Sequence, residues 1–133
     1  NDHPFFQDIN FQSDFHKAKK IEKKFKDQAF IYKGYFKDSL QNEKKLNDVE
    51  KIKFAHIDCD LYISAIEPVE YLLKRMVKGS YLMIDDFTNI DPDGNSIRDL
   101  FHEKFQNFDY EITSYFGIDG VVIRFFGIDK IND

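Results

Sequence analysis

One short stretch decides the fold: Lys53-Phe-Ala-His-Ile-Asp-Cys-Asp60. Residues 53–57 form a mostly apolar run that stops abruptly at Asp58 and Asp60. Such a run is typical of a buried parallel strand, and the acids then stand where the strand ends. The pattern therefore predicts a parallel β-strand that carries its polar chemistry at the carboxyl end.

A second stretch repeats this plan later in the chain. Residues 81–84 form another apolar run, which ends in Asp85 and Asp86. A loop rich in Pro, Gly and Asn follows, and the pattern then predicts a helix from about Ser96 to Phe105. The order of strand, acid and helix thus occurs twice.

Apolar side chains at helical spacing lie between the two strands, from Ile66 to Met76. Ser64 and Glu67 have the spacing of a capping box, and Gly79 stands where a helix would end. We therefore expect a helix that connects the two strands and is terminated by Gly79.

The last part of the sequence predicts an antiparallel hairpin, with strands at 110–116 and 121–126 joined across residues 117–120. The order strand-helix-strand-helix-strand-strand favours an α/β fold.

The first third of the sequence is less regular. We expect a loop at 1–13, an amphipathic helix over 14–28 with Asp14 as its N-cap, and a short strand at 29–32. A turn and a charged connection follow over residues 35–50. The many Lys residues of the helix are interpreted as a solvated face.

Composition limits the classes of function. A chain of 133 residues with 42% hydrophobic residues can fold as one domain or as a large piece of one. The net charge of -5 gives no general reason to expect nucleic acid or an anionic membrane as partner. Cys59 is the only cysteine and no apolar stretch could span a bilayer, so a cytoplasmic setting is expected.

The acids indicate a site for a hard cation. Ligands of open α/β sheets bind at the carboxyl ends of the strands, so Asp58, Asp60, Asp85 and Asp86 are expected to converge there. Oxygen-only ligands favour Mg²⁺ over zinc. The alternative is that each acid merely caps the helix that follows its strand. Asp60 and Asp86 fit that role better, whereas Asp58 and Asp85 are the better ligand candidates.

Several stretches resemble the macrocin O-methyltransferase family. They are residues 54–64, residues 72–79, Tyr81-Leu-Met-Ile-Asp-Asp-Phe87, and Tyr32-Lys-Gly-Tyr-Phe-Lys-Asp-Ser-Leu40, which is similar to the family's Gly-Trp-Phe-Lys-Asp-Thr-Leu segment. Residues 1–4 look like a loop of that family. The resemblance implies a Rossmann-like class I methyltransferase sheet with S-adenosylmethionine as methyl donor and Mg²⁺ as metal.

The resemblance also implies roles for particular residues. Asp58, Asp85 and Asp86 match the family's metal ligands, and Asp58 is also expected at the donor site. A general base is expected from the loop corresponding to residues 1–16, where His3 and His16 are the candidates. Among the other histidines, His56 is expected in the core with a hydrogen bond, and His102 is expected to be exposed.

The sequence departs from class I methyltransferases at its start. It contains 6 Gly and no Gly-rich turn of the kind that grips the donor. We therefore expect residues 1–133 to be the C-terminal portion of a single methyltransferase domain, with the donor-binding N-terminal half absent. The resemblance implies an O-methyltransferase, but this portion alone is expected to be inactive. The implied acceptor is a small molecule with a hydroxyl, such as a sugar or glycoside.

Two alternatives remain. A strand ending in Asp58-Cys-Asp60 also fits a metal-dependent nucleotide-sugar glycosyltransferase, although that class does not explain Asp85 and Asp86. The chain could instead be a non-catalytic α/β interaction module or part of a homo-oligomer, with exposed aromatic residues such as Phe5, Phe6 and Phe36 marking the contact face.

Overall fold

The computed structural model describes residues 15–128 of the chain. These residues fall into two compact units that divide between Tyr35 and Phe36, and each unit is described by itself. The predicted loop at 1–13 and the predicted N-cap Asp14 lie outside the described residues. None of the described helices is long and apolar enough to cross a membrane.

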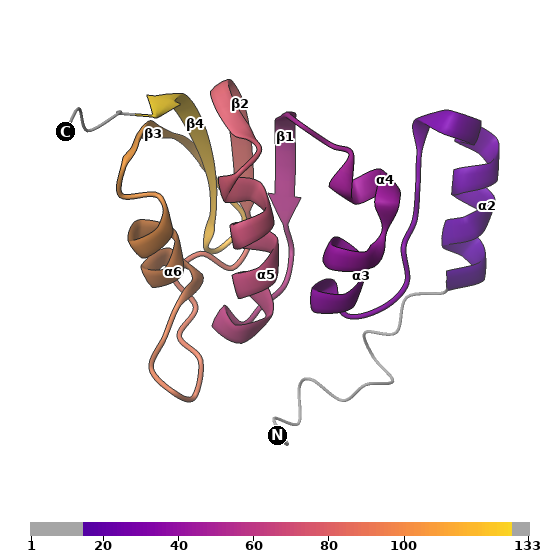
Figure 1. Cartoon of the computed structure of the whole chain (residues 1–133). Coiled ribbons are helices and arrows are strands. Elements are labelled where there is room, and N and C mark those ends of the chain that lie inside the picture. Colours follow the sequence, from indigo (N-terminus) through magenta and orange to yellow (C-terminus); the bar gives the residue numbers. More distant parts are fainter. Residues whose placement is uncertain (1–14, 129–133) are drawn as a thin grey trace. The chain divides into compact units, whose positions relative to one another are not determined.

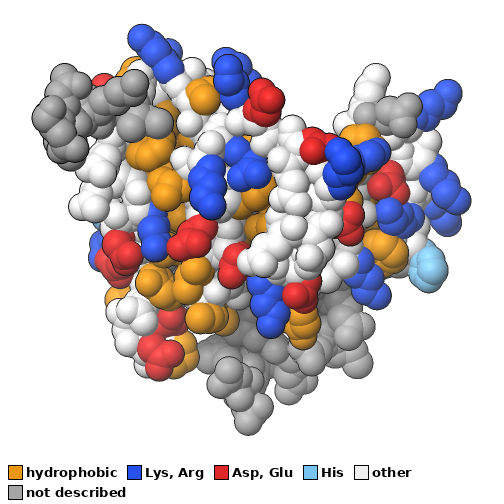
Figure 2. All heavy atoms as spheres, viewed as in Figure 1, with side chains coloured by type: hydrophobic (Ala, Val, Ile, Leu, Met, Phe, Trp, Pro, Cys, Tyr) orange, Lys and Arg blue, Asp and Glu red, His pale blue; other side chains and the backbone are white. Residues whose placement is uncertain are grey.

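The first unit is built on one amphipathic helix, α2 (Phe15–Phe25), which continues into a short 3-10 helix, η1 (Lys26–Gln28). Lys side chains gather on the surface over this helix (Figure 2). The helix predicted over residues 14–28 is therefore confirmed for the part that is described, and its basic face lies at the surface.

The short strand predicted at residues 29–32 is wrong, since this segment has no regular structure. The N–H of Ile31 donates to Oε1 of Glu22 at 2.9 Å, and the carbonyl of Ile31 accepts from Nζ of Lys19 at 3.0 Å. Side chains of α2 thus satisfy backbone groups that a neighbouring strand would otherwise bind.

The second unit contains a four-stranded sheet in the order β1-β2-β4-β3 (Figure 1). Its strands are β1 (Ile52–Ile57), β2 (Met76–Ile84), β3 (Phe108–Phe116) and β4 (Gly120–Ile128). β1 and β2 are parallel, whereas β4 is antiparallel to both β2 and β3. The predicted α/β class, the two parallel strands that end in acids and the C-terminal hairpin are therefore confirmed.

The helices described in the second unit are α3 (Phe36–Asn42), α4 (Lys44–Asn47), α5 (Tyr62–Leu73) and α6 (Ile97–Lys104). The short helices α3 and α4 replace the turn and charged connection predicted over residues 35–50. α5 connects β1 to β2, and α5 and α6 lie side by side in front of the sheet (Figure 1). One face of the sheet is thereby covered.

The core lies between that face and the two covering helices. Ile84 of β2 and Ile123 and Phe125 of β4 are at most 1% exposed. The ring of Phe101 in α6 stacks on that of its C-cap Phe105 at 4.8 Å between centroids, and Phe105 also contacts Phe125 at 5.3 Å. Burial of these large apolar groups is the main source of stability for the sheet and hence for the loops at its edge.

The opposite face carries side chains that the described helices of this unit leave partly open. Phe54 is 60% exposed, and its cross-strand neighbours are Tyr81, which is 37% exposed, and then Arg124. His56 is exposed as well, so the expectation of a core histidine there is wrong. Since side chains alternate along a strand, Ile57 faces the core and His56 does not.

The start of α5 differs from the prediction. The helix begins at Tyr62 with Leu61 as its N-cap and has no side-chain cap, so the predicted capping box of Ser64 and Glu67 is wrong. Tyr62 packs against the core. This contact favours a helix that begins two residues ahead of Ser64.

The predicted helix end at Gly79 is also wrong, because α5 ends at Leu73 and Gly79 lies inside β2 with φ of 84°. A positive φ of this size favours glycine. Beside it, the buried hydroxyl of Ser80 donates to the carbonyl of Ile52 at 2.6 Å and accepts from the N–H of Val77 at 2.9 Å. These bonds hold β2 against β1 where the pairing register shifts.

Candidate metal centre

The carboxyl ends of β1 and β2 lie next to each other. Ile57 pairs with Ile84 as the last residue of each strand, and the N–H of Asp85 donates to the carbonyl of Ile57 at 3.1 Å. The chain therefore leaves both strands at the same edge of the sheet. The acidic residues that follow the strands are brought to that edge.

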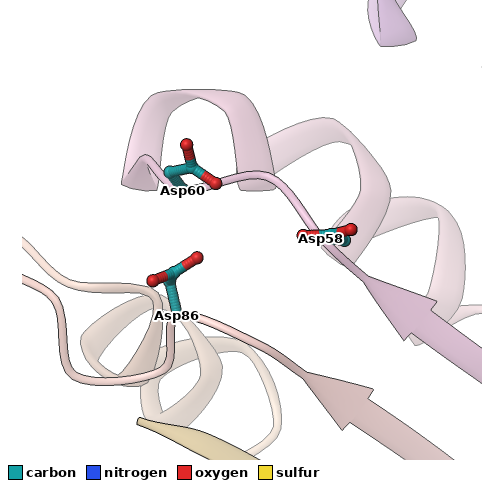
Figure 3. A group of neighbouring side chains, drawn as sticks. All are labelled: Asp58, Asp60 and Asp86. Atoms are coloured by element: carbon teal, nitrogen blue, oxygen red, sulfur yellow. The ribbon is translucent and has the colours of Figure 1, made fainter. Parts of the chain in front are cut away.

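Three carboxylates form a cluster there. Asp58, Asp60 and Asp86 each offer an oxygen, and these oxygens all lie within 4.8 Å of one another. Asp58 and Asp60 come from the segment after β1 and Asp86 from the segment after β2, and their side chains lie around the space between the two strand ends (Figure 3). Asp58 is exposed, and Asp60 and Asp86 are half-buried.

The repulsion within this cluster is visible in the pKa of Asp86. Partial burial raises the pKa of this carboxyl above its ordinary value of 3.8, and the charges of Asp60 and Asp85 and a hydrogen bond with Asp60 raise it further. The charge of Asp119 acts in the same direction. Carboxylates at this range are stabilised either by a proton or by a cation.

Cys59 lies between the two acids of the first segment. Burial, followed by the charges of Asp60, Asp58 and Asp86, raises the pKa of its thiol to about 11. The side chain therefore stays a neutral thiol at ordinary pH. In that form it is a poor metal ligand, which leaves an all-oxygen donor set.

The members of the cluster differ from the predicted ligands at one position. Asp58 and Asp86 are both in the cluster, but the third member is Asp60, which the sequence favoured as a helix cap. Asp60 does not cap α5, whose N-cap is Leu61 without a side-chain bond. Asp85 stands beside the cluster and acts on Asp86 through its charge.

The sequence predicted two candidate general bases, His3 and His16. His3 lies outside the described residues, and His16 is exposed on α2 in the first unit. His102 is exposed as expected, and its Nδ1 lies 3.1 Å from the hydroxyl of Tyr110.

A residue that the sequence did not single out fixes the loop after Asp86. The carboxylate of Asp119 accepts hydrogen bonds from the N–H and the hydroxyl of Thr88, and the carbonyl of Asp119 accepts from the N–H of Phe87 at 3.3 Å. Asp119 belongs to the turn between β3 and β4, 31 residues from Thr88. The glycines around it predict the turn, but no local pattern indicates its distant partner.

Gly120 keeps this turn tight. A Cβ at position 120 would collide with the ring of Phe116, which lies directly over the glycine. Gly117 has φ of 58°, a left-handed value that glycine adopts without strain. Both glycines therefore favour the tight turn that brings Asp119 to the edge of the sheet, and a side chain at position 120 would require the ring of Phe116 to move.

The sequence matches the family described as Macrocin-O-methyltransferase (TylF) over residues 12–121, which is most of the chain. The chain belongs to the macrocin-O-methyltransferase family. The match contains β1, β2, both acidic segments and the start of β4, so it covers the whole carboxylate cluster of this family member. No curated protein matches the chain. Membership of a macrocin-O-methyltransferase family supports the methyltransferase class.

Proposed function

We propose that the chain acts in S-adenosylmethionine-dependent, Mg²⁺-assisted O-methyl transfer to a hydroxyl of a sugar, a glycoside or a related small molecule. The sheet would be part of a Rossmann-like class I methyltransferase fold. The observation that carries the proposal is the convergence of Asp58, Asp60 and Asp86 at the carboxyl ends of two parallel strands, within a match to an O-methyltransferase family.

The residues fit a small hard cation. Mg²⁺ binds oxygen ligands at about 2.0–2.1 Å, so two ligands on opposite sides of it are about 4.2 Å apart. The oxygens of Asp58, Asp60 and Asp86 lie within 4.8 Å of one another, so a small rotation of the side chains would complete the contacts. The raised pKa of Asp86 indicates that a positive charge would be favourable there.

The four acids have two kinds of role in the proposed reaction. Asp58, Asp60 and Asp86 would hold the metal, and Asp85, which follows β2 directly, adds negative charge beside it. The bound cation would supply charge that orients the acceptor hydroxyl and lowers its pKa. Because three carboxylates do not fill an octahedral shell, positions remain for acceptor oxygens.

The proton of the acceptor hydroxyl needs a base, and His3 and His16 remain the proposed candidates. Asp58 likewise remains a proposed contact of the methyl donor. Replacing His16 with Gln removes a base without changing the size of the side chain much. If His16 is the base, the variant lowers the methyl-transfer rate of a longer chain with the donor-binding half at least tenfold, while metal affinity is unchanged.

The family match favours methyl transfer over the glycosyltransferase alternative. The two differ in donor: in a longer protein that includes the donor-binding half, S-adenosylhomocysteine should stabilise a methyltransferase against heat, whereas uridine diphosphate should stabilise a sugar transferase. The reading as a non-catalytic module predicts that neither compound has an effect.

Metal binding is the part of the proposal that can be tested directly on this chain. Titration of the purified chain with Mg²⁺, and with Mn²⁺ followed by electron paramagnetic resonance, should show one site that Asp58→Asn and Asp60→Asn each weaken at least tenfold. Asp109→Asn is the matched control, because Asp109 is an exposed residue of β3 outside the cluster. Equal binding by all these proteins would contradict the metal site, and methyl transfer to sugar hydroxyls that is unaffected by a chelator would contradict its role.

A further inference from the structure

A cavity opens beside the carboxylate cluster, within the second unit. It has a volume of about 390 Å³ and lies between α6 and the turn of the β3–β4 hairpin. Pockets that bind small organic ligands have volumes of about 300–1,000 Å³. Phe87 and Thr88, which follow Asp86 in the chain, form part of its lining, so the cavity and the cluster share one loop.

The hairpin wall of this cavity is apolar. Ile112, Tyr115, Phe116 and Ile118 line it. Three of them are unusually open for large apolar side chains: Ile112 is 36% exposed, Tyr115 is 76% exposed and Ile118 is fully exposed. Exposed apolar groups that gather along a concave surface are typical of a binding site, whereas scattered ones are not.

The helix wall of the cavity supplies cationic and imidazole donors. The N–H of Arg98 is fixed by the carbonyl of Phe87 at 2.8 Å, but its guanidinium has only a long contact of 3.7 Å with Asp99. The N–H and the hydroxyl of Ser96 both donate to Oδ2 of Asp99, at 3.1 and 2.6 Å, and hold this carboxylate at the start of α6, so that its Oδ1 stays 3.7 Å from the guanidinium. Arg98 therefore keeps most of its donors for a ligand.

His102 stands one turn further along the same helix. Its ring lies against Phe87 and Phe101, with centroids 6.3 and 5.9 Å apart, and its Nδ1 faces Tyr110 at 3.1 Å. The acid of the lining, Asp119, has its carboxylate engaged by Thr88. Among the described residues that line the cavity, Arg98 is therefore the permanent cation, and the one carboxylate is hydrogen-bonded to Thr88.

We propose that this cavity binds an amphiphilic organic anion: an apolar, ring-sized group against the hairpin wall, carrying a carboxylate or a phosphate that Arg98 binds. A guanidinium matches either anion with two parallel hydrogen bonds. Resting on the proposed function, the cavity holds the part of the methyl acceptor remote from the reacting hydroxyl. The acceptor class is then narrowed to hydroxylated compounds with an apolar ring and an acidic group.

The test compares three probes of the same shape, by calorimetric titration of the full chain without metal or donor. The probes are 2-naphthoate, 2-naphthyl phosphate and the neutral 2-naphthamide. At least one anion should bind five times or more tightly than the amide, and the tighter anion identifies the acidic group. Equal affinity for all three, or no binding of any, would overturn the proposal.

Variants distinguish the contributions of the helix wall and the hairpin wall to probe binding. Arg98→Gln should abolish the preference for the anions, whereas Ile118→Ser should weaken all three probes alike. Lys104→Gln is the matched control: Lys104 lies on the same helix but binds Glu70 at 3.1 Å and is not part of the lining. A preference that survives Arg98→Gln would contradict the assignment.

These titrations are independent of the metal. If anion binding is found and Mg²⁺ binding is not, the assignment of the cavity as an anion site is supported and the proposed Mg²⁺-assisted reaction is contradicted. If Mg²⁺ binds and the probes do not, the proposed function stands and this inference fails.

Discussion

Asp119 and Thr88 are joined by two hydrogen bonds, from the N–H and from the hydroxyl of Thr88 to the same carboxylate. Thr88 is two residues beyond Asp86, a member of the carboxylate cluster. The hairpin turn therefore determines where one of the metal-binding candidates lies, although Asp119 is not itself in the cluster.

Thr88→Val should loosen this link, because valine keeps the shape of threonine but lacks the hydroxyl. We expect a loss of about 1 kcal/mol in the free energy of unfolding and a several-fold loss of Mn²⁺ affinity. Thr113→Val is the control, since Thr113 donates one hydrogen bond to the carbonyl of Val122 within the hairpin and is not in the cluster. If both variants bind Mn²⁺ equally well, the link does not position Asp86.

Asp86 should make the metal-free protein less stable as pH rises. Its pKa is raised in the folded state, so the folded chain holds this proton more tightly than the unfolded chain, whose Asp titrates near 3.8. The free energy of unfolding therefore decreases as pH increases from about 3.8 through the raised pKa, and the full loss applies above it. Asp86→Asn removes this loss.

Thermal unfolding in a chelator measures the effect. At pH 7 we expect Asp86→Asn to unfold at a higher temperature than the parent chain, and Mg²⁺ to stabilise the variant less. Asp93→Asn makes the same change of net charge in an exposed loop. Equal shifts for the two variants would mean that only net charge matters.

The thiol of Cys59 should react slowly. An increase of its pKa from 9.0 to about 11 lowers the thiolate fraction roughly 100-fold at pH 8. Iodoacetamide should therefore modify the folded chain much more slowly than the chain in guanidinium, and the folded rate should still rise above pH 9. Since Cys59 is the only cysteine, mass spectrometry reports this site alone. The same rate in both states would contradict the prediction.

Ser80→Ala should destabilise the sheet. The variant leaves the carbonyl of Ile52 and the N–H of Val77 without their buried partner, at a cost of about 1–3 kcal/mol. Ser114→Ala, at an exposed position of β3, controls for the loss of a hydroxyl from a strand. Urea unfolding measures both, and a difference below about 0.5 kcal/mol would argue against the role of Ser80.

The sequence was sufficient to predict an element where its local pattern agrees with its tertiary contacts. The apolar run before Asp58 became β1, and Ser96 became the N-cap of α6, with the capping box completed by Asp99. The glycines at 117 and 120 mark the hairpin turn, which the structure confirms. In each case the signal lies within a few neighbouring residues.

The sequence was insufficient where contacts between residues far apart in the chain determine the structure. Gly79 has the local pattern of a helix end, but the bond from Ser80 to Ile52, 28 residues away, extends β2 past it. His56 was expected in the core, yet the face of the sheet on which it lies is partly open. The place of Asp60 beside Asp86 likewise depends on how two strand ends meet, which no local spacing encodes.

β2 is paired on both sides, with β1 in parallel and β4 in antiparallel arrangement. Its amides should consequently be among the last of the described residues to exchange with deuterium, after those of the outer strand β3. The acids that follow β2 are thus attached to one of the two inner strands of the sheet. Partial opening of the hairpin's outer strand would leave their anchor intact.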